Sequence, residues 1–166
     1  IFKTVNGGEN WETVLDSPTD PFIKVTALND STFVAVTSAK YYRYTTNGGS
    51  IWQFSDTALT GNFQAVCLKS INEVYALSGT NLISTNDAFQ TYTIRPTIEE
   101  PLGPQTFNVV YFSGSLTGVI SKNTGQVLKT TNGGISWVVT SYAPFFFPNI
   151  KAIAGTGDRV MIVGEY

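Results

Sequence analysis

Histidine is absent from this sequence of 166 residues, and cysteine occurs once, at Cys67. Without histidine, the chain has no histidine-ligated zinc site and no catalytic triad based on histidine. A single thiol cannot form a disulfide within the chain, and the alternating stretch around Cys67 predicts a buried structural side chain. No run of about 18 apolar residues is present, so the sequence predicts no membrane span.

Charged residues are also scarce, at 13%, whereas apolar residues make up 42% and aromatic residues 13%. The net charge of −2 and the lack of a basic stripe argue against nucleic acid as a partner. Such a low charge density excludes a disordered chain. The many aromatic residues are typical of β proteins, and the length suffices for one domain with a sizeable core.

An eight-residue pattern, called the box below, occurs four times. Each box begins with threonine, has Asn or Asp third and ends in an aromatic residue, and three boxes have glycine fifth. These residues are Thr4, Asn6, Gly8 and Trp11; Thr45, Asn47, Gly49 and Trp52; Thr85, Asp87 and Tyr92; and Thr130, Asn132, Gly134 and Trp137. The third positions are 41, 40 and 45 residues apart, and a period of this size indicates a repeat architecture.

Short alternating segments rich in Val, Tyr, Phe and Thr lie between the boxes, bounded by turn residues, and no stretch has helical periodicity. The predicted strands are 1–4, 10–15, 22–28, 32–38, 41–46, 51–55, 62–68, 73–77, 82–85, 91–95, 107–112, 117–121, 126–131, 136–141, 149–154 and 159–163. Four-stranded repeats of about 40 residues are typical of β-propeller blades.

We therefore predict an all-β fold, a single β-propeller domain or propeller segment over residues 1–166. Its parts are a half-blade at 1–16, blades at 21–56, 62–97 and 106–142, and a half-blade at 149–166. The half-blades are complementary, since the first supplies strands three and four of a blade and the last supplies strands one and two. Two alternatives stay open, a self-closed ring of four blades and part of a larger propeller.

The box residues predict a turn between strands three and four of each blade. The Asn or Asp side chain can accept hydrogen bonds from nearby backbone N–H groups, the glycine permits positive φ, and the aromatic residue can cover the turn. In the third box, Asp87 is followed by Phe89 at the glycine position, which predicts a distorted turn. Calcium is not expected, because Asp87 is the only carboxylate at the third position of a box and calcium needs several. No cofactor is expected.

The form Thr-x-Asn-Gly-Gly-x-x-Trp resembles the Asp-box, also called the bacterial neuraminidase repeat. With the preceding Phe2-Lys-Thr4 and Leu128-Lys-Thr130 runs, it is similar to propellers of the photosystem II assembly-factor type. The resemblance implies a propeller and leaves function open, because the box is a structural device. Similar repeats are common in secreted and surface proteins of bacteria, so the resemblance implies an extracytoplasmic location.

Partner binding is expected on the loops opposite the boxes. Phe145, Phe146 and Phe147 lie between prolines in one such loop, where an exposed apolar cluster would mark a contact site. The alternative is that these three rings fill the space between neighbouring blades. Glu99 and Glu100 would form an acidic rim in another loop, or simply a solvated one.

A sialidase is the enzyme that the box suggests, and the family resemblance implies an arginine triad for its substrate. The three arginines here, Arg43, Arg95 and Arg159, fall on predicted strands three, four and two, whereas a central site draws on first strands. Other glycosidases need two carboxylates at a defined separation, which the sequence alone cannot pair. We therefore expect a non-enzymatic interaction or scaffold module whose partner is a protein or a neighbouring domain of the same chain. The alternative is a glycan-binding propeller or a sialidase-like glycoside hydrolase.

Overall fold

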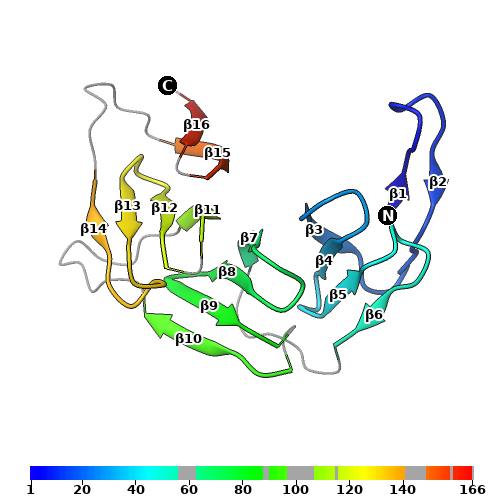
Figure 1. The fold of residues 1–166 in the computed structure, drawn as a ribbon, viewed down its shortest axis with the longest axis horizontal. Coiled ribbons are helices and arrows are strands. Elements are labelled where there is room, and N and C mark those ends of the chain that lie inside the picture. Colours follow the sequence, from blue (N-terminus) through cyan, green and yellow to red (C-terminus); the bar gives the residue numbers. More distant parts are fainter. Residues whose placement is uncertain are drawn as a thin grey trace. The chain divides into compact units, whose positions relative to one another are not determined.

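The computed structural model describes residues 1–55, 63–87, 90–96, 107–114, 116–140, 149–157 and 159–165. Within these ranges the chain forms strands, turns and loops and no helix, so the all-β prediction is confirmed. It follows that no helix in the described ranges could cross a membrane. The chain divides into two compact units, Ile1–Thr60 and Gly61–Tyr166, and each is described by itself (Figure 1).

The Ile1–Thr60 unit contains a two-stranded and a four-stranded antiparallel sheet. The smaller sheet pairs β1 (Phe2–Lys3) with β2 (Glu12–Thr13). The larger sheet is a meander of β3 (Phe22–Ala27), β4 (Phe33–Thr37), β5 (Tyr42–Thr45) and β6 (Gln53–Phe54).

The Gly61–Tyr166 unit contains two four-stranded meanders and one hairpin, all antiparallel. The first meander consists of β7 (Phe63–Leu68), β8 (Val74–Ser78), β9 (Asn81–Thr85) and β10 (Thr93–Pro96). The second consists of β11 (Phe107–Phe112), β12 (Gly118–Lys122), β13 (Val127–Thr130) and β14 (Val138–Val139). The hairpin pairs β15 (Asn149–Thr156) with β16 (Arg159–Glu165).

Every predicted strand overlaps an observed one, but the strands that follow a box are shorter than predicted. Strands β2, β6 and β14 have two residues each. The cause lies in the box, because the backbone N–H groups of Asn10, Ile51 and Ser136 donate to the third box residue. These N–H groups are therefore not available to a strand ladder, and the pairing begins later.

The first strand of each four-stranded sheet has an irregular register near its start, and so has β15. The register shifts lie between residues 22 and 24, 63 and 65, 107 and 109, and 150 and 152. A β-bulge of this kind bends a strand and increases its local twist. Because the bulge recurs near the start of the first strand in each repeat, the repeats share backbone geometry outside the boxes as well.

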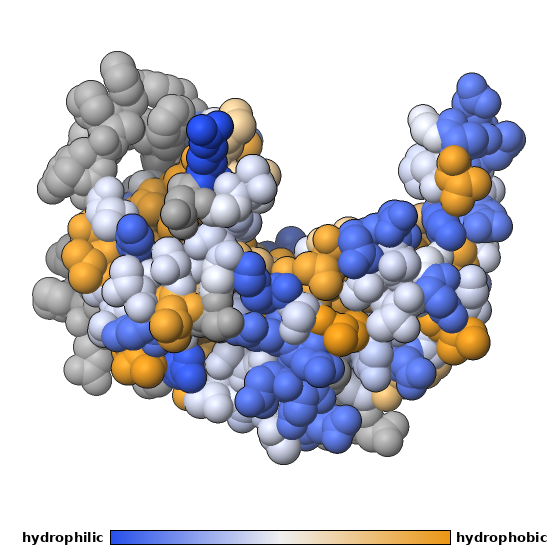
Figure 2. All heavy atoms as spheres, viewed as in Figure 1, coloured by the Kyte–Doolittle hydropathy of each residue, from blue (hydrophilic) through white to orange (hydrophobic). Residues whose placement is uncertain are grey.

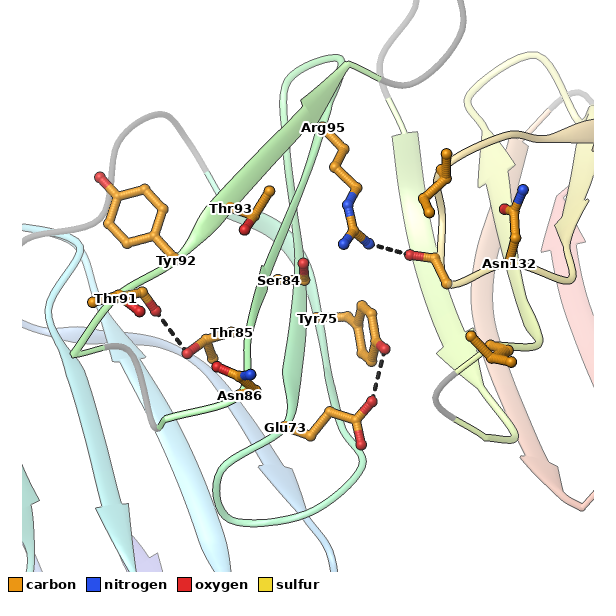
Figure 3. A pocket seen from close by; sticks show the side chains of 13 residues that line it. Glu73, Tyr75, Ser84, Thr85, Asn86, Thr91, Tyr92, Thr93, Arg95 and Asn132 are labelled. Carbon is orange, nitrogen blue, oxygen red and sulfur yellow. Dashed lines mark hydrogen bonds between the residues drawn. The ribbon is translucent and has the colours of Figure 1, made fainter.

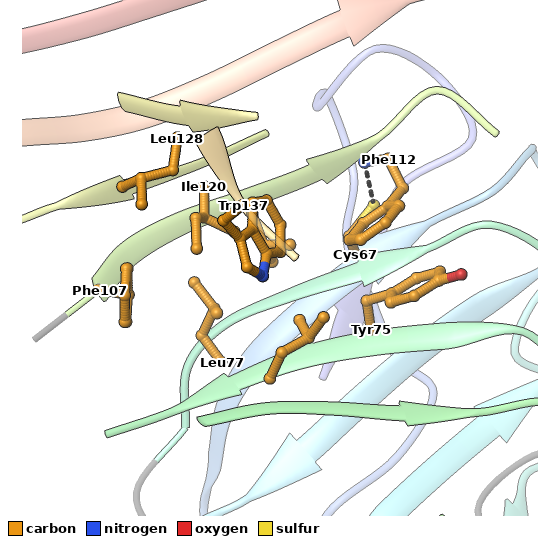
Figure 4. Close-up of a cluster of buried hydrophobic side chains, with 10 residues drawn as sticks. Cys67, Tyr75, Leu77, Phe107, Phe112, Ile120, Leu128 and Trp137 are labelled. Atoms are coloured by element: carbon orange, nitrogen blue, oxygen red, sulfur yellow. Dashed lines mark hydrogen bonds between the residues drawn. The ribbon is translucent and has the colours of Figure 1, made fainter. Parts of the chain in front are cut away.

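The core of the Gly61–Tyr166 unit lies between its two meanders (Figure 4). Leu77 and Leu82 from the first meander share this cluster with Phe107, Ile120 and other side chains of the second. All four of these side chains are at most 2% exposed. The cluster therefore joins the two neighbouring sheets of this unit.

Cys67 is buried in the same cluster, as the sequence predicts. Its Sγ accepts a hydrogen bond from the backbone N–H of Phe112 at 3.3 Å, and burial raises the pKa of the thiol. The Phe112 ring stacks on Tyr75 with the ring centroids 3.7 Å apart. The thiol thus serves as a packing group between two sheets.

Candidate functional site

The box turn is built around its threonine hydroxyl. In the fourth box, Thr130 Oγ1 accepts hydrogen bonds from the backbone N–H groups of Gly134 at 2.9 Å and Asn132 at 3.3 Å. The same hydroxyl donates to Asn132 Oδ1 at 2.9 Å, and this oxygen also accepts from the N–H of Ser136 at 2.9 Å. Thr130 is 1% exposed, so the hydroxyl satisfies polar backbone groups away from water.

The same arrangement recurs in the other boxes. The threonine hydroxyl donates to the third box residue at 2.8, 2.9 and 2.7 Å in the first, second and third boxes. It accepts from the fifth residue's N–H in the first and second boxes, at 2.9 and 3.1 Å. The turn was predicted from its Asn and glycine residues, and the central role of the threonine was not predicted. The signal was present, since threonine begins every box.

The third box keeps these bonds around Asp87. Its Oδ1 accepts from the Thr85 hydroxyl at 2.7 Å and from the N–H of Thr91 at 2.9 Å. Hydrogen bonds, led by that from the Thr91 side chain, lower the pKa of Asp87. The predicted distortion concerns residues 88 and 89, which lie outside the described part of the chain.

The fifth-position glycine contacts the preceding sheet. A Cβ added to Gly134 would overlap Leu82 Cδ2, and one added to Gly49 would lie 3.3 Å from Val14 Cβ. Gly134 also has φ of +83°, a backbone conformation that residues other than glycine rarely adopt. The box thus joins two strands within a sheet and lets that sheet approach the previous one.

A groove opens beside one of these contacts, between the two meanders of the Gly61–Tyr166 unit (Figure 3). We call it the hydroxyl groove, and its volume is about 280 Å³. It is lined by Glu73, Tyr75, Ser84, Thr85, Asn86, Thr91, Tyr92, Thr93, Arg95, Leu116, Asn132, Gly133 and Ile135. Most of these residues carry hydroxyl or amide groups, and the residues of the second meander come from its turns.

Strand register explains how the polar wall of the hydroxyl groove forms. Thr93 on β10 pairs with Ser84 on β9, and Ser84 pairs with Tyr75 on β8, so the three side chains share one face of the sheet. Arg95 lies two residues beyond Thr93 on that face and donates to the backbone oxygen of Gly133. The arginine therefore links the first meander to the fourth box.

Among the described lining residues one carries a carboxylate, Glu73, which accepts a hydrogen bond from the Tyr75 hydroxyl at 2.8 Å. Burial, and then this hydrogen bond, raise the pKa of Tyr75, so the phenol stays protonated and acts as a donor. The hydroxyl groove thus combines the side chains of an arginine and a glutamate with several hydroxyl groups.

The Ile1–Thr60 unit has a corresponding groove beside its second box, which we call the aromatic groove. Its volume is about 680 Å³. It is lined by Ile1, Phe2, Lys3, Thr4, Val5, Trp11, Val14, Val25, Asp30, Phe33, Gly48, Gly49 and Trp52. Here too the described lining residues include one carboxylate, Asp30, but most of them are apolar.

The residues predicted to bind a partner are not among those the structure describes. Phe145, Phe146 and Phe147 and the pair Glu99 and Glu100 all lie outside the described residues, so their role stays a prediction. The grooves were not predicted, because each forms where two sheets meet and its lining residues are far apart in sequence. Within the described ranges, no group of three or more His, Cys, Asp or Glu side chains could hold a metal ion.

The arginines lie where the sequence predicts them, Arg43 on β5, Arg95 on β10 and Arg159 on β16. The Arg43 guanidinium lies over two aromatic rings of its own sheet unit, 4.7 Å from the Phe54 centroid and 5.2 Å from that of Tyr41. Arg95 is committed to a backbone oxygen. Both arginines thus have structural contacts.

Comparison with known proteins gives structural matches only. No protein-family model matches the sequence, and no curated protein matches it significantly. A structure of YCF48 from Cyanidioschyzon merolae superposes with a TM-score of 0.74 over 99% of this chain and 60% of that one, at 14% identity. A structure of YCF48 bound to a D1 peptide gives a TM-score of 0.59 over 73% of this chain and 39% of that one, at 18% identity.

An ancestral GH74 enzyme is also similar, with a TM-score of 0.66 at 17% identity over 92% of this chain and 22% of that one. The chain thus spans 39% and 60% of the two YCF48 chains, and less of the GH74 enzyme. At such identities the likeness concerns the fold, and it agrees with the resemblance to assembly-factor propellers seen in the sequence. The chain therefore has the β-propeller fold that is found in YCF48 and in GH74 enzymes.

Proposed function

We propose that this chain is a non-enzymatic interaction module that binds an extended segment of a protein partner. The hydroxyl groove is the observation that carries the proposal. It combines donors and acceptors with two exposed apolar side chains, Leu116 at 61% and Ile135 at 71% exposure. Apolar anchors beside a polar wall are what a peptide segment with mixed side chains requires.

The strand beside the groove favours an extended ligand. In the order β10-β9-β8-β7, β10 is an edge strand, so one row of its N–H and C=O groups has no partner within that sheet. An extended peptide can add to such an edge through its main chain, while its side chains enter pockets at alternate positions. Thr93 and Arg95 on β10 line the groove at that spacing.

The carboxylates of the grooves support binding over catalysis. Among the described residues each groove is lined by one, Glu73 in the hydroxyl groove and Asp30 in the aromatic groove. Glycoside hydrolysis ordinarily uses two carboxyl groups across the scissile bond. The fold neighbour YCF48 has been seen bound to a peptide, which supports a protein partner for this fold.

Glycan binding is the second candidate, and the aromatic groove favours it. Trp11 is 61% exposed and Phe2 is 69% exposed, and both line this groove together with Trp52. Exposed aromatic faces are suitable platforms for sugar rings, and GH74 enzymes share the fold. This candidate predicts a carbohydrate ligand in the Ile1–Thr60 unit.

A display library of random peptides, followed by calorimetry with the enriched peptides, tests the proposal. We expect Leu116→Ser and Ile135→Ser each to weaken binding by about tenfold or more, since each removes an apolar anchor. Ile51→Ser is the matched control, because Ile51 is also an exposed isoleucine in a box, at 63% exposure, but lies outside the groove. Equal loss in all three variants, or no enriched peptide, would overturn the proposal.

Xyloglucan serves as the carbohydrate probe, because one GH74 neighbour is a xyloglucanase from Xanthomonas campestris. If the chain is a protein-binding module, we expect it neither to bind xyloglucan nor to release reducing sugar from it. Binding that is lost in Trp11→Ala would establish the glycan candidate instead, and hydrolysis would make the chain an enzyme.

We further propose that the module belongs to a secreted or cell-surface bacterial protein. The resemblance of the boxes to repeats of such proteins supports this. Antibody labelling of intact cells, compared with permeabilised cells, measures the location.

We also propose that Phe145–Phe147 and Glu99–Glu100 contribute to partner contact. Serine at the three Phe positions should therefore reduce partner binding more than it reduces the stability of the fold.

A further inference from the structure

Two side chains of opposite charge, those of Glu73 and Arg95, line the hydroxyl groove, and Tyr75 lies between them (Figure 3). Both walls of this groove belong to the Gly61–Tyr166 unit, and each wall is part of a four-stranded sheet. Glu73 and Arg95 are both half-buried, so a ligand in the groove meets both of them. The groove therefore has a negative and a positive side, which a partner has to match.

The position of Glu73 is fixed by its backbone and by its side chain. Its backbone N–H donates to Ser70 Oγ at 2.9 Å, and its backbone oxygen accepts from the N–H of Lys69 at 3.0 Å. Its carboxyl group accepts from the hydroxyl of Tyr75, whose ring stacks on Phe112. A carboxylate has several lone pairs, so this bond still lets it accept from a ligand. The acidic side chain is thus oriented before a partner binds, which lowers the cost of binding.

The position of Arg95 is fixed by the opposite wall. Its guanidinium donates to the backbone oxygen of Gly133, which is a buried residue of the fourth box. Because a guanidinium has several N–H donors in one plane, it can bind a carboxylate of a ligand while it keeps this bond. The positive side of the groove is therefore pre-oriented as well.

Building on the proposed function, on which this inference rests, we propose that the hydroxyl groove selects an extended segment with one acidic and one basic side chain at alternate positions. The acidic side chain binds Arg95, and the basic one binds Glu73. Alternate side chains of an extended chain point to the same side about 7 Å apart, whereas adjacent ones point to opposite sides. This spacing suits two charged groups that flank a single tyrosine side chain.

The arrangement also acts against segments with charges of one sign. Such a segment gains one favourable pairing in the groove and suffers one repulsion, and like charges placed together oppose binding. The two charges of the groove have opposite signs, so they add little long-range attraction and act mainly on the choice of partner. The class of partner is thus a segment of mixed charge.

The random-peptide library that tests the proposed function also tests this inference. We expect the enriched peptides to carry an acidic and a basic residue at alternate positions more often than the unselected library does. In a synthetic copy of the best binder, moving the basic residue by one position should weaken binding by about threefold or more, although the composition is unchanged. If the move leaves the affinity unchanged, this inference is wrong and the proposed function stands. If no peptide is enriched, both are wrong.

Changes on the protein assign each charge. Glu73→Gln keeps an acceptor for the Tyr75 hydroxyl but removes the charge, so it should weaken binding of the selected peptide by about threefold or more. For a copy of the peptide with glutamine in place of the basic residue, this variant and the original chain should bind alike. Glu165→Gln is the matched control, because Glu165 lies in the same unit and pairs with Lys151 outside the groove.

A reversal of charge gives the strictest test. Glu73→Lys should prefer a copy of the peptide with glutamate in place of the basic residue over the selected peptide itself. Arg95→Gln should bind the selected peptide and its copy with glutamine in place of the acidic residue equally well, and circular dichroism shows whether each variant is folded. The inference is overturned if folded Glu73→Lys still prefers the selected peptide, or if Glu165→Gln weakens binding as much as Glu73→Gln does.

Discussion

Replacing Trp137 by alanine should destabilise the Gly61–Tyr166 unit by about 3–5 kcal/mol. Trp137 is 9% exposed, and its ring meets that of Phe112 edge-on, with centroids 6.3 Å apart and planes at 78°. A large aromatic side chain buries about 200 Å², which at about 25 cal/mol per Å² gives an upper bound of about 5 kcal/mol. Part of this stabilisation remains, because alanine keeps its Cβ contacts.

Urea unfolding followed by far-ultraviolet circular dichroism measures this loss. Fluorescence is unsuitable, since Trp137 is the single tryptophan between residues 61 and 166. If the two units unfold separately, each transition must be fitted by itself.

Trp11→Ala is the matched control, because Trp11 occupies the same box position but is 61% exposed. It should cost about 1 kcal/mol or less. The reasoning is refuted if the Trp137 variant loses less than about 1 kcal/mol, or if both variants lose the same amount.

Three further predictions concern the boxes. Thr130→Val should cost about 2–3 kcal/mol in urea unfolding, since it leaves the buried N–H of Gly134 and the part-buried N–H of Asn132 without their acceptor. Gly134→Ala should lower the melting temperature much more than Gly7→Ala, because both have positive φ but only the first would overlap Leu82. The pKa of Asp87 is lower in the folded chain than in the unfolded chain, so its carboxylate stabilises the fold above the unfolded-state pKa of about 4. This stabilisation is lost as the pH falls through the folded-state pKa. Asp87→Asn should remove that part of the acid sensitivity in urea midpoints compared at about pH 6 and about pH 3.

Each of these has a result that contradicts it. A fully stable Thr130→Val would mean that water replaces the hydroxyl. Equal melting of the Gly134 and Gly7 variants would mean that backbone strain outweighs contact with the neighbouring sheet. For Asp87, unchanged acid sensitivity in the asparagine variant would show that other carboxylates dominate.

The fold could be predicted from the sequence because its turns are marked by short, local groups of residues. Asn29-Asp30 and the glycines of the boxes mark turns by backbone requirements that a few residues determine, so the order and number of strands follow. The length of β2 could not be predicted from the sequence. Asn10 looks like strand sequence, yet its N–H donates to Asn6, which lies four residues earlier.

The grooves escaped prediction for a different reason. Glu73 and Ile135 belong to different sheets, and only the packing of those sheets brings them to one cavity. No local sequence pattern predicts which residues of two different sheets will line one cavity. Thr93 and Arg95 carried a partial signal, since their alternation on one strand put a hydroxyl and a cation on a common face, but nothing in the sequence identified what that face would meet.

On the surface shown in Figure 2, hydrophobic side chains form small separate patches among hydrophilic ones. Small exposed apolar patches are ordinary in folded proteins. The proposed binding site is therefore defined by the cavity that Leu116 and Ile135 line, and not by a large hydrophobic surface patch.

The pairing of each strand with its sequence neighbour has a consequence for how the protein folds during synthesis. Every ladder in the described sheets joins consecutive strands, and in every box the threonine hydroxyl donates to the residue two positions later. Contacts of such short sequence separation form quickly, and domains acquire structure from the N-terminal side as the chain emerges. A ribosome-bound chain can therefore complete one meander before the next has been translated, and a pause in translation between meanders would leave few unpaired strands exposed.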